Sequence, residues 1–330
     1  MKYYEKTAKG IKCLLCRHYC NLSEGQIGIC GVNKNENGEL KNLVYGKLAA
    51  LNIDPIEKKP LYHFLPGSKA LSLGTVGCNL KCPFCQNWQI SQTGDLSFSE
   101  TVTPEQVVAL ALEKKCQTIA YTYNEPTVFY PFAHDTALLA KQYGIKNIFV
   151  SNGMESPEVI ADMSNKIDAF NIDLKSFNPD FYKKTLKGKL EYVLDTLKLI
   201  KRSGFWLEVT TLIVPGENDS EKELNEIAAF ISKELGHETP WHISAFYPTY
   251  KMTDKERTSG TALATAYEIG LKHGLKYIYK GNVAEPGITK CPSCQRELIV
   301  RNGYFVTKNV LTEKGTCPYC NTKIEGIWKP

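Results

Sequence analysis

The residues of this chain best suited to chemistry are its twelve cysteines, which are grouped rather than scattered. Grouped cysteines in a reducing compartment indicate metal sites rather than disulfides. One cysteine, Cys116, belongs to no group. It stands at the end of a predicted helix, and we interpret it as an inert buried thiol. The others form the patterns C-x3-C-x2-C (Cys78, Cys82, Cys85), C-x2-C-x3-C-x9-C (Cys13, Cys16, Cys20, Cys30) and a pair of C-x2-C motifs (Cys291, Cys294, Cys317, Cys320).

The central group offers three ligands, not four. Three thiolates can hold a zinc ion with water in the fourth position, or three of the irons of a [4Fe–4S] cube. Both arrangements leave one coordination position open for another ligand. The number of cysteines therefore indicates a reactive metal site without identifying the metal.

Each flanking group is a quartet. In the C-terminal quartet, each C-P-x-C motif presents two sulfurs and two motifs complete a tetrahedron, so we predict a structural zinc ribbon, with iron in a rubredoxin-like site as the alternative. For the N-terminal quartet we favour zinc. An iron–sulfur centre that feeds electrons to the central site, or cysteines without metal, are the alternatives, and His18 is a candidate to replace one cysteine as a ligand.

The elements that must position the central cysteines form a repeating α/β pattern. Short apolar runs typical of buried strands alternate with amphipathic segments typical of helices, and one of these helices opens with Thr103 as N-cap and Pro104 at its first position. The strands are predicted at 70–77, 118–123, 147–153, 169–175, 206–215 and 241–248, and the helices at 103–115, 131–143, 156–165, 178–202, 220–235 and 261–273.

Polar residues recur at or just beyond the ends of these strands, and one lies on the sixth strand. A closed or partly closed barrel brings such ends to one mouth, so we predict a (β/α)6 partial TIM barrel over residues 66–286. A cysteine-rich extension (1–65) precedes it, and a zinc-ribbon-like segment (287–330) follows it. The polar residues are the three central cysteines, Asn124, Glu125, Ser151, Asn152, Asp173, Lys175 and His242.

Composition and charge narrow the function classes. The 330-residue chain is 43 % hydrophobic, and its net charge of +5 is spread as Lys mixed with Glu, which argues against a nucleic-acid surface. No run approaches the roughly 18 apolar residues of a membrane span, and the first residues lack the apolar core of a signal peptide. We expect a cytoplasmic protein with no membrane or nucleic-acid partner.

The C-x3-C-x2-C pattern directly after the first strand, with aromatic Phe84 before the last cysteine, resembles the radical S-adenosylmethionine (radical SAM) superfamily. The resemblance implies that Cys78, Cys82 and Cys85 hold a [4Fe–4S] cluster whose fourth iron binds S-adenosylmethionine. Reduction then cleaves the sulfonium bond to give methionine and a 5′-deoxyadenosyl radical, which abstracts hydrogen from a substrate. A flavodoxin or ferredoxin is the implied electron donor.

The resemblance also implies roles at the barrel mouth. Glu125 stands in Tyr-Asn-Glu-Pro where relatives carry Gly-Gly-Glu, so it is expected to accept hydrogen bonds from the methionine ammonium, with Asn124 supplying a side-chain contact. Lys175 matches a lysine that pyruvate formate-lyase-activating enzymes use on the methionine carboxylate. Asp173 matches part of their monovalent-cation pocket, but another carboxylate of that pocket is Val150 here, which departs from the pattern.

The remaining expected contacts involve the nucleoside part of the cofactor. Ser151 and Asn152 are placed for the ribose, with a strand-end turn as the alternative. His242 is expected near the adenosyl group, with a satisfied core histidine as the alternative. Phe84 is expected to cover the adenine.

Nearly the whole layout resembles one branch, the radical SAM enzymes of the AmmeMemoRadiSam system, often described as pyruvate formate-lyase-activating-like. The branch does not identify the substrate. A glycyl-radical-enzyme activase, which implies a protein substrate, and direct modification of a protein side chain or small molecule are both open. A zinc-ribbon binding protein and a ferredoxin-like electron carrier are the non-radical alternatives. The matching segments include GCNLKCPFCQNW, TYNEPT, SNGM, NIDLKSF, LIVPGENDS, PWHISAFYP and YKGNV.

Overall fold

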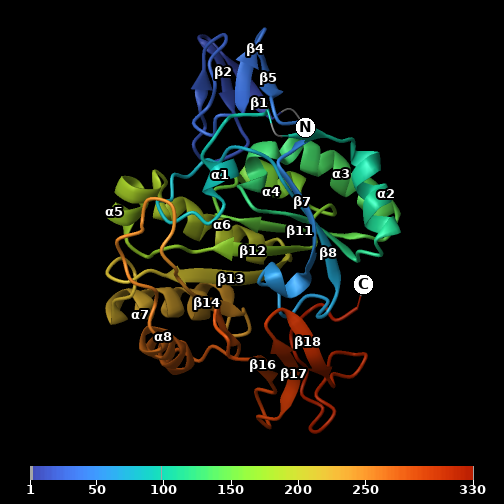
Figure 1. Ribbon diagram of the computed structural model, residues 1–330, viewed down its shortest axis with the longest axis vertical. Coiled ribbons are helices and arrows are strands. Elements are labelled where there is room, and N and C mark those ends of the chain that lie inside the picture. Colours follow the sequence, from blue (N-terminus) through green and yellow to red (C-terminus); the bar gives the residue numbers. More distant parts are fainter. Residues whose placement is uncertain (1–2, 98, 330) are drawn as a thin grey trace.

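The computed structural model describes residues 3–97 and 99–329. Its longest axis runs from an N-terminal lobe through a central α/β body to a C-terminal β segment (Figure 1). Within the described ranges, no helix has the length and apolarity that a membrane crossing needs.

The central body contains an eight-stranded sheet in the order β15-β14-β13-β12-β11-β10-β8-β7. Seven of these described strands run parallel in sequence order, and β7 joins the edge antiparallel to β8. The two edges, β7 and β15, do not pair with each other, so the barrel is open. The strands are β7 (Ala50–Pro55), β8 (Lys69–Gly74), β10 (Thr118–Tyr121), β11 (Lys146–Ser151), β12 (Ala169–Asp173), β13 (Trp206–Ile213), β14 (Trp241–Ala245) and β15 (Ile278–Gly281).

This architecture confirms the partial-barrel prediction, and all six predicted strands are present. The seventh parallel strand, β15, follows α8 after a short turn and was not predicted. Strand β7 lies within the range assigned to the N-terminal extension, yet it pairs with β8 over six residues of the main sheet.

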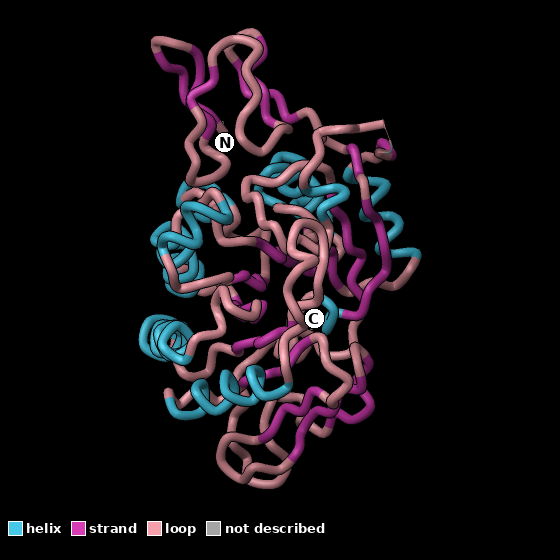
Figure 2. The backbone as a smooth tube through the Cα atoms, turned by 60° about the vertical axis from the view of Figure 1, so that its left-hand side comes forward, coloured by secondary structure: helices cyan, strands magenta, loops and turns pink. Residues whose placement is uncertain are grey.

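Helices lie outside the sheet (Figure 2). Helix α2 begins with the predicted cap, because the Thr103 side chain accepts from the Gln106 N–H and the Gln106 side chain accepts in return from the Thr103 N–H. The helices are α1 (Trp88–Ser91), α2 (Pro104–Glu113), α3 (Tyr130–Gln142), α4 (Pro157–Asp162), α5 (Pro179–Phe181), α6 (Leu190–Arg202), α7 (Glu221–Phe230) and α8 (Gly260–Lys272).

The single helix predicted over 178–202 is wrong, because the segment is broken. Helix α5 continues into a π-helical turn that ends at Leu186, and Lys187 then adopts a left-handed φ of 62°. At Gly188 the chain passes so close to the cysteine loop that a Cβ would lie 2.7 Å from Leu80 Cδ2. The break therefore makes room for the loop that carries the three central cysteines.

The N-terminal lobe is built of short antiparallel strands. One sheet has the order β1-β2-β3, and β4 pairs with β5. The lobe contacts the barrel through a bridge between Cys16 and Glu155. Its strands are β1 (Tyr4–Thr7), β2 (Gly10–Cys13), β3 (Asn21–Leu22), β4 (Asn33–Glu36) and β5 (Glu39–Asn42), and β6 (Lys47–Leu48) pairs with β9 (Glu100–Thr101) beside it.

The C-terminal segment forms a three-stranded antiparallel sheet of β16 (Gly287–Lys290), β17 (Glu297–Asn302) and β18 (Phe305–Asn309). It is anchored by Arg301, a fully buried cation. Arg301 Nη2 donates to the Tyr62 carbonyl oxygen at 2.6 Å and Nη1 donates to Thr289 Oγ1 at 3.0 Å, while Nε lies 3.6 Å from Glu57 Oε1. A buried charge with these partners fixes the segment against the chain that leads into the barrel.

Candidate active site

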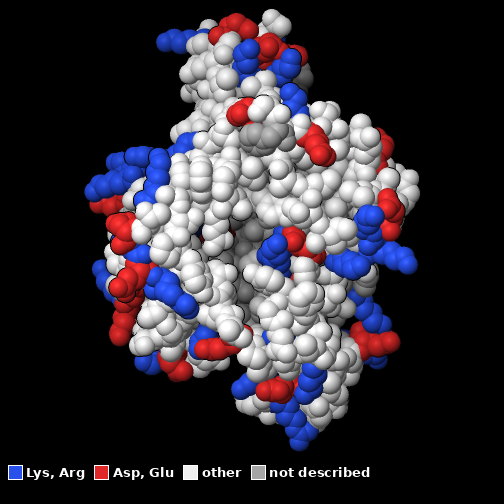
Figure 3. All heavy atoms as spheres, in the orientation of Figure 1, with Lys and Arg blue, Asp and Glu red and all other residues white. Residues whose placement is uncertain are grey.

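A cavity of about 570 Å³ opens at the ends of the parallel strands. Figure 3 shows a hollow near the centre of one face, with charges of both signs interspersed around it. Polar side chains and thiols from all seven parallel strands or their following loops line this cavity together. Among them are all residues predicted for the cluster and cofactor: Cys78, Cys82, Phe84, Cys85, Asn124, Glu125, Ser151, Asn152, Asp173, Lys175 and His242.

The three cysteines lie on the loop between β8 and α1, which backbone and side-chain bonds hold in place. The Gly77 N–H donates to the Ile90 carbonyl oxygen at 2.9 Å, and the Lys81 N–H donates to the Leu186 carbonyl oxygen at 2.9 Å. Asn124 Nδ2 donates to the Gly77 carbonyl oxygen at 2.7 Å, and Asn124 Oδ1 accepts from the Thr75 N–H. Asn124 thus fixes the start of the cysteine loop, a role that the sequence alone did not suggest.

Glu125 is a fully buried carboxylate that joins the ends of two strands. Its Oε1 accepts from the Thr127 hydroxyl at 2.6 Å and from the Ser151 hydroxyl at 2.9 Å, and its Oε2 accepts from the Asn152 N–H at 2.8 Å. Burial raises the pKa of Glu125, while these donors oppose the increase. The carboxylate lines the cavity, and the bonds around it fix its position there.

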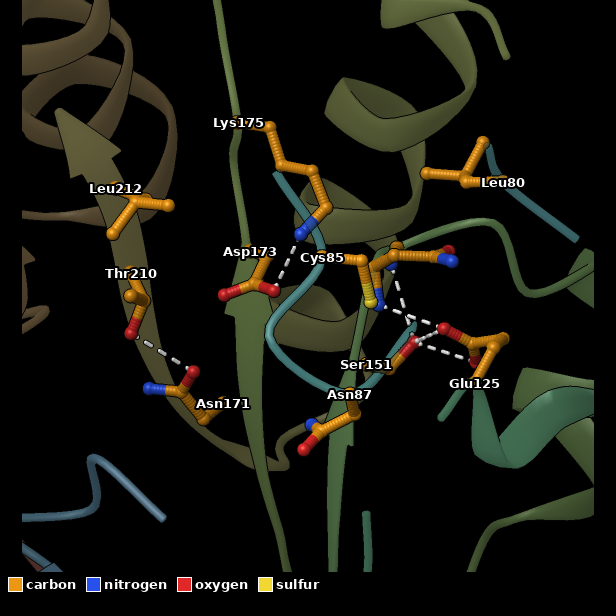
Figure 4. Close-up of polar contacts among 12 residues, drawn as sticks. Leu80, Cys85, Asn87, Glu125, Ser151, Asn171, Asp173, Lys175, Thr210 and Leu212 are labelled. Carbon is orange, nitrogen blue, oxygen red and sulfur yellow. Dashed lines mark hydrogen bonds and ion pairs between the residues drawn. The ribbon is translucent and has the colours of Figure 1, made fainter. Parts of the chain in front are cut away.

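Lys175 follows β12 and pairs with Asp173 on the end of the same strand. The Nζ–Oδ2 distance is 2.7 Å. Burial would lower the pKa of Lys175, but the neighbouring Asp173 carboxylate raises it above its ordinary value, so the ammonium stays charged. In the view of Figure 4, Cys85 lies between Lys175 and Glu125.

Ser151 and Asn152, which end β11 and begin the loop after it, reach toward both Glu125 and the cysteine loop. Asn152 Nδ2 donates to Asn79 Oδ1 at 2.8 Å and lies 3.9 Å from Cys78 Sγ. The Ser151 hydroxyl donates to Glu125. Both side chains line the cavity where the predicted ribose contacts would form, and both are engaged with the chain.

His242, on β14, is held by a buried carboxylate. Its Nε2 lies 2.6 Å from Glu208 Oε2, and Glu208 also accepts from the N–H groups of Tyr62 and His63 and from the Trp206 indole. These contacts, together with burial, are those of a positioned histidine rather than one free to rotate. Glu208 was not predicted, although a charged residue inside the apolar run WLEVTTLIV is a detectable signal.

Burial dominates the electrostatics of Cys78 and Cys82. Burial raises the pKa of Cys82 to about 11 although Lys175 opposes the increase, and it raises the pKa of Cys78 as well. Such thiols are poor free nucleophiles, and binding to a metal is what deprotonates them. The electrostatics therefore fit metal ligands better than nucleophilic catalysis.

The lining of the cavity also includes residues that we did not predict from the sequence. Lys59 and Glu57 come from the segment before β8, and Tyr304 comes from the hairpin tip between β17 and β18. Phe84 packs parallel to Phe181 at a centroid distance of 6.3 Å and closes another side. Tyr304 lies more than 200 residues after the cysteine loop in the chain, and only the docking of the C-terminal segment brings it to the same cavity.

The C-terminal quartet forms a compact metal-binding geometry. The Sγ atoms of Cys291, Cys294, Cys317 and Cys320 all lie within 4.8 Å of one another, with pairs at 3.5 and 3.7 Å. The residue that directly follows each C-P-x-C motif, Gln295 or Asn321, has a left-handed backbone conformation, as a tight knuckle requires. Hydrogen bonds from Thr322 lower the pKa of Cys320 to about 6, which favours a thiolate. The predicted four-sulfur site is present in this segment.

The N-terminal quartet is arranged differently. Its four thiols surround one small cavity, but among the described residues no three of them approach one another within 4.8 Å. Cys116, predicted to be inert, is buried and belongs to none of these groups, and burial raises the pKa of its thiol.

Comparisons with known proteins agree with this geometry. Residues 72–231 match the family described as the Radical SAM superfamily. Uncharacterized protein MJ0808 of Methanocaldococcus jannaschii is 43 % identical over 98 % of each chain. A protein of the same organism named as a putative glycyl-radical enzyme activating enzyme (MJ1632) is 25 % identical over 62 % of this chain and 78 % of its own.

Among solved structures, a radical SAM methyltransferase from Sphaerobacter thermophilus matches with a TM-score of 0.53 at 15 % identity. The match covers 67 % of this chain and 68 % of that one. At this identity the likeness concerns the fold.

Proposed function

The chain belongs to the radical SAM superfamily, and from this premise we propose that Cys78, Cys82 and Cys85 bind the [4Fe–4S] cluster and that Glu125 and Lys175 bind the two ends of the methionine part of S-adenosylmethionine. When bound, these cofactors supply reductive cleavage of S-adenosylmethionine to a 5′-deoxyadenosyl radical, which abstracts hydrogen from the substrate.

One observation carries this proposal: three buried thiols, a fixed carboxylate and a charged lysine line the same cavity. No three of the central sulfurs lie within 4.8 Å of one another, whereas the C-terminal quartet is tight enough for a single ion. Wider spacing fits a cluster, in which each thiolate binds a different iron. The donor set and its spacing therefore fit the cofactors of the family.

The protein's own residues contribute position and charge. Glu125 Oε2 has one close donor, the Asn152 N–H, besides the Ser151 hydroxyl at 3.1 Å, and a carboxylate oxygen with this geometry can still accept from an ammonium. Lys175 Nζ offers a charge-assisted bond to a carboxylate. Asp173 holds Lys175 in place through the same ion pair that keeps it charged, and we assign it this role in preference to a cation pocket.

We assign the nucleoside contacts to the other cavity residues. Phe84 lies beside the cysteines with Phe181 behind it, which suits an adenine cover. The Ser151 and Asn152 side chains and His242 offer polar atoms for the ribose, and Asn124 acts by holding the cysteine loop.

Anaerobic purification tests this proposal. The protein is reconstituted with iron and sulfide, reduced, and mixed with S-adenosylmethionine, and 5′-deoxyadenosine is measured by chromatography. Wild type should form it, and Cys82→Ala should not, while the matched variant Cys116→Ala should behave as wild type. Equal product from Cys82→Ala, or none from an iron-loaded wild type, would refute the proposal.

A glycyl-radical-enzyme activase is the second candidate, favoured by the named relative MJ1632. It predicts a protein substrate that reaches the cavity past the exposed side chain of Tyr304. The AmmeMemoRadiSam branch remains our expectation for the reaction class. Incubation with glycyl-radical enzymes and with cell extract, followed by electron paramagnetic resonance (EPR), separates a stable glycyl radical from modification of another substrate.

We also propose zinc at the C-terminal quartet and a flavodoxin or ferredoxin as the electron donor. The short sulfur–sulfur distances support a single tetrahedral ion, and the segment has a small core that a metal would reinforce. Grouped cysteines support a reducing, cytoplasmic location.

A further inference from the structure

We propose that the N-terminal quartet (Cys13, Cys16, Cys20, Cys30) binds a second, fully ligated [4Fe–4S] cluster, and not the zinc that the sequence favoured. Its role as an electron relay rests on the proposed function of the central cysteines, but its metal content does not.

The sulfur spacing argues against a single ion. In a tetrahedral zinc site the Zn–S bonds of about 2.3 Å place the sulfurs about 3.8 Å apart. The C-terminal quartet has this spacing, with sulfur pairs at 3.5 and 3.7 Å. In the N-terminal quartet, by contrast, no three sulfurs lie within 4.8 Å of one another. The quartet therefore resembles the central cysteines, as expected where each thiolate binds a separate iron.

The cavity between the four thiols supports the same conclusion. It has a volume of about 10 Å³, roughly the space that admits one water-sized sphere. The centre of a zinc site, about 2.3 Å from every sulfur, would have no such space. The other lining residues are mostly apolar, namely Leu15, Leu22, Ile29 and Val128, with Asn33 and Gly28. Four sulfurs with mostly apolar neighbours form the kind of lining that surrounds a buried cluster.

The Cys30 thiol also receives a hydrogen-bond donor, of the kind that supports a thiolate carrying a cluster's charge. Asn33 Nδ2 donates to Cys30 Sγ at 3.5 Å. This contact would stabilise negative sulfur in a buried site.

Asn79 links the quartet to the central cysteines. It is fully buried, and its Nδ2 has no hydrogen-bond partner among the described residues. Asn79 directly follows Cys78, and its carbonyl oxygen lies 2.8 Å from His18 Nε2. The segment that carries Cys78 thus contacts the segment that carries Cys16, so the two groups of cysteines lie on neighbouring parts of the fold.

The relay requires one electron at a time. A reduced low-potential carrier protein, such as a flavodoxin, is oxidised by one electron and reduces the N-terminal cluster by one. That cluster is reoxidised when it passes the electron to the cluster at Cys78. Because all four of its irons have cysteine ligands, the N-terminal cluster has no open position and does not bind S-adenosylmethionine.

The test compares two variants after anaerobic reconstitution, by iron, sulfide and zinc analysis and by EPR of the reduced proteins. The triple variant Cys78→Ala/Cys82→Ala/Cys85→Ala keeps the quartet, and Cys16→Ala/Cys20→Ala removes it, with Cys116→Ala as the control. We expect about eight irons in wild type and in the control and about four in each variant. S-adenosylmethionine should change the EPR signal of the quartet variant and leave that of the triple variant unchanged.

The inference is overturned if the triple variant, with a circular dichroism spectrum like that of wild type, binds no iron and sulfide, or binds two zinc ions per chain. The triple variant leaves the N-terminal lobe unaltered, so a misfolded quartet variant would not hide this result. If the triple variant keeps about four irons but wild type gives no S-adenosylmethionine response, the second cluster stands and the proposed function fails.

Discussion

The Ser151 hydroxyl donates to Glu125 at 2.9 Å, and this bond joins the end of β11 to the loop that follows β10. The carboxylate is therefore fixed before any ligand binds. It combines two roles, because it ties two strand ends together and also lines the cavity. A preorganised acceptor binds a cation without the cost of ordering its own side chain.

Replacing Glu125 should separate these roles. Glu125→Gln keeps the shape and one carbonyl oxygen but removes the charge that would bind an ammonium. A hydrogen bond to a charged group contributes about 1.5–3 kcal/mol, so S-adenosylmethionine should bind roughly ten- to one-hundred-fold more weakly with iron content unchanged. Titration of the cofactor-induced EPR change measures this, with Glu113→Gln on the exposed face of α2 as the control. Equal affinities would rule out the assigned contact.

Lys175 should act on the other end of the cofactor. Lys175→Met removes the ammonium and leaves Asp173 unpaired, so we expect a loss of S-adenosylmethionine affinity similar to that of Glu125→Gln. The control is Lys184→Met, whose ammonium pairs with Asp180 on the surface, and its effect should be smaller. The same EPR titration reports both. If Lys175→Met bound S-adenosylmethionine as wild type does, the carboxylate would have another partner.

Glu208 should be essential to stability. Four donors meet at this buried carboxylate, two of them backbone N–H groups of the segment that precedes β8. Glu208→Ala leaves them without a partner and should lower the free energy of unfolding by about 3–5 kcal/mol. Urea denaturation followed by circular dichroism measures the loss. Glu208→Gln keeps an acceptor and should lose less; an equal loss in both variants would show that charge, not hydrogen bonding, is decisive.

Asp54 predicts a pH dependence of stability. Lys58 and Lys59 lie 2.9 and 2.7 Å from its carboxylate oxygens, and Tyr123 donates to it at 2.7 Å. Burial would raise the pKa of Asp54, but these partners hold it well below its usual range. Because the folded pKa is below the unfolded value of about 3.9, the stabilisation is complete above that value and is lost as the pH falls below it.

Unfolding free energies measured between pH 7 and pH 3 check this expectation. Wild type should lose more stability than Asp54→Asn as the pH falls, since the variant has no carboxyl to protonate. Asp195→Asn, at an exposed position on α6, should follow wild type. Parallel curves for wild type and Asp54→Asn would contradict the assignment.

Removal of the C-terminal metal should loosen the hairpin at the cavity rim. Cys294→Ser should lower zinc content by about one per chain, and because metal binding contributes folding energy to such small segments, Tyr304 should become more accessible to hydrogen exchange. Iron content should stay constant. A variant that kept its zinc would show that another group binds the zinc, and one that lost iron instead would show that the quartet binds iron.

The sequence by itself determined the elements and their order. Apolar runs followed by helices predicted six parallel strands, because burial on both faces leaves a signal in every residue of such a strand. The C-x3-C-x2-C spacing identified the family, since a short loop brings its ligands together without help from distant parts. The same locality explains the C-terminal quartet, whose two knuckle turns fold on their own residues.

Only the tertiary structure decided contacts between distant segments. No local pattern indicates that Asn124 holds the cysteine loop, that Glu208 restrains His242, or that Tyr304 reaches the cavity, because each depends on how packed elements meet. The helix predicted over 178–202 is interrupted for the same reason, since the cysteine loop occupies its path at Gly188. The N-terminal quartet is the sharpest case: four cysteines in sequence favoured zinc, whereas the cluster that we propose rests on how far apart folding places their sulfurs.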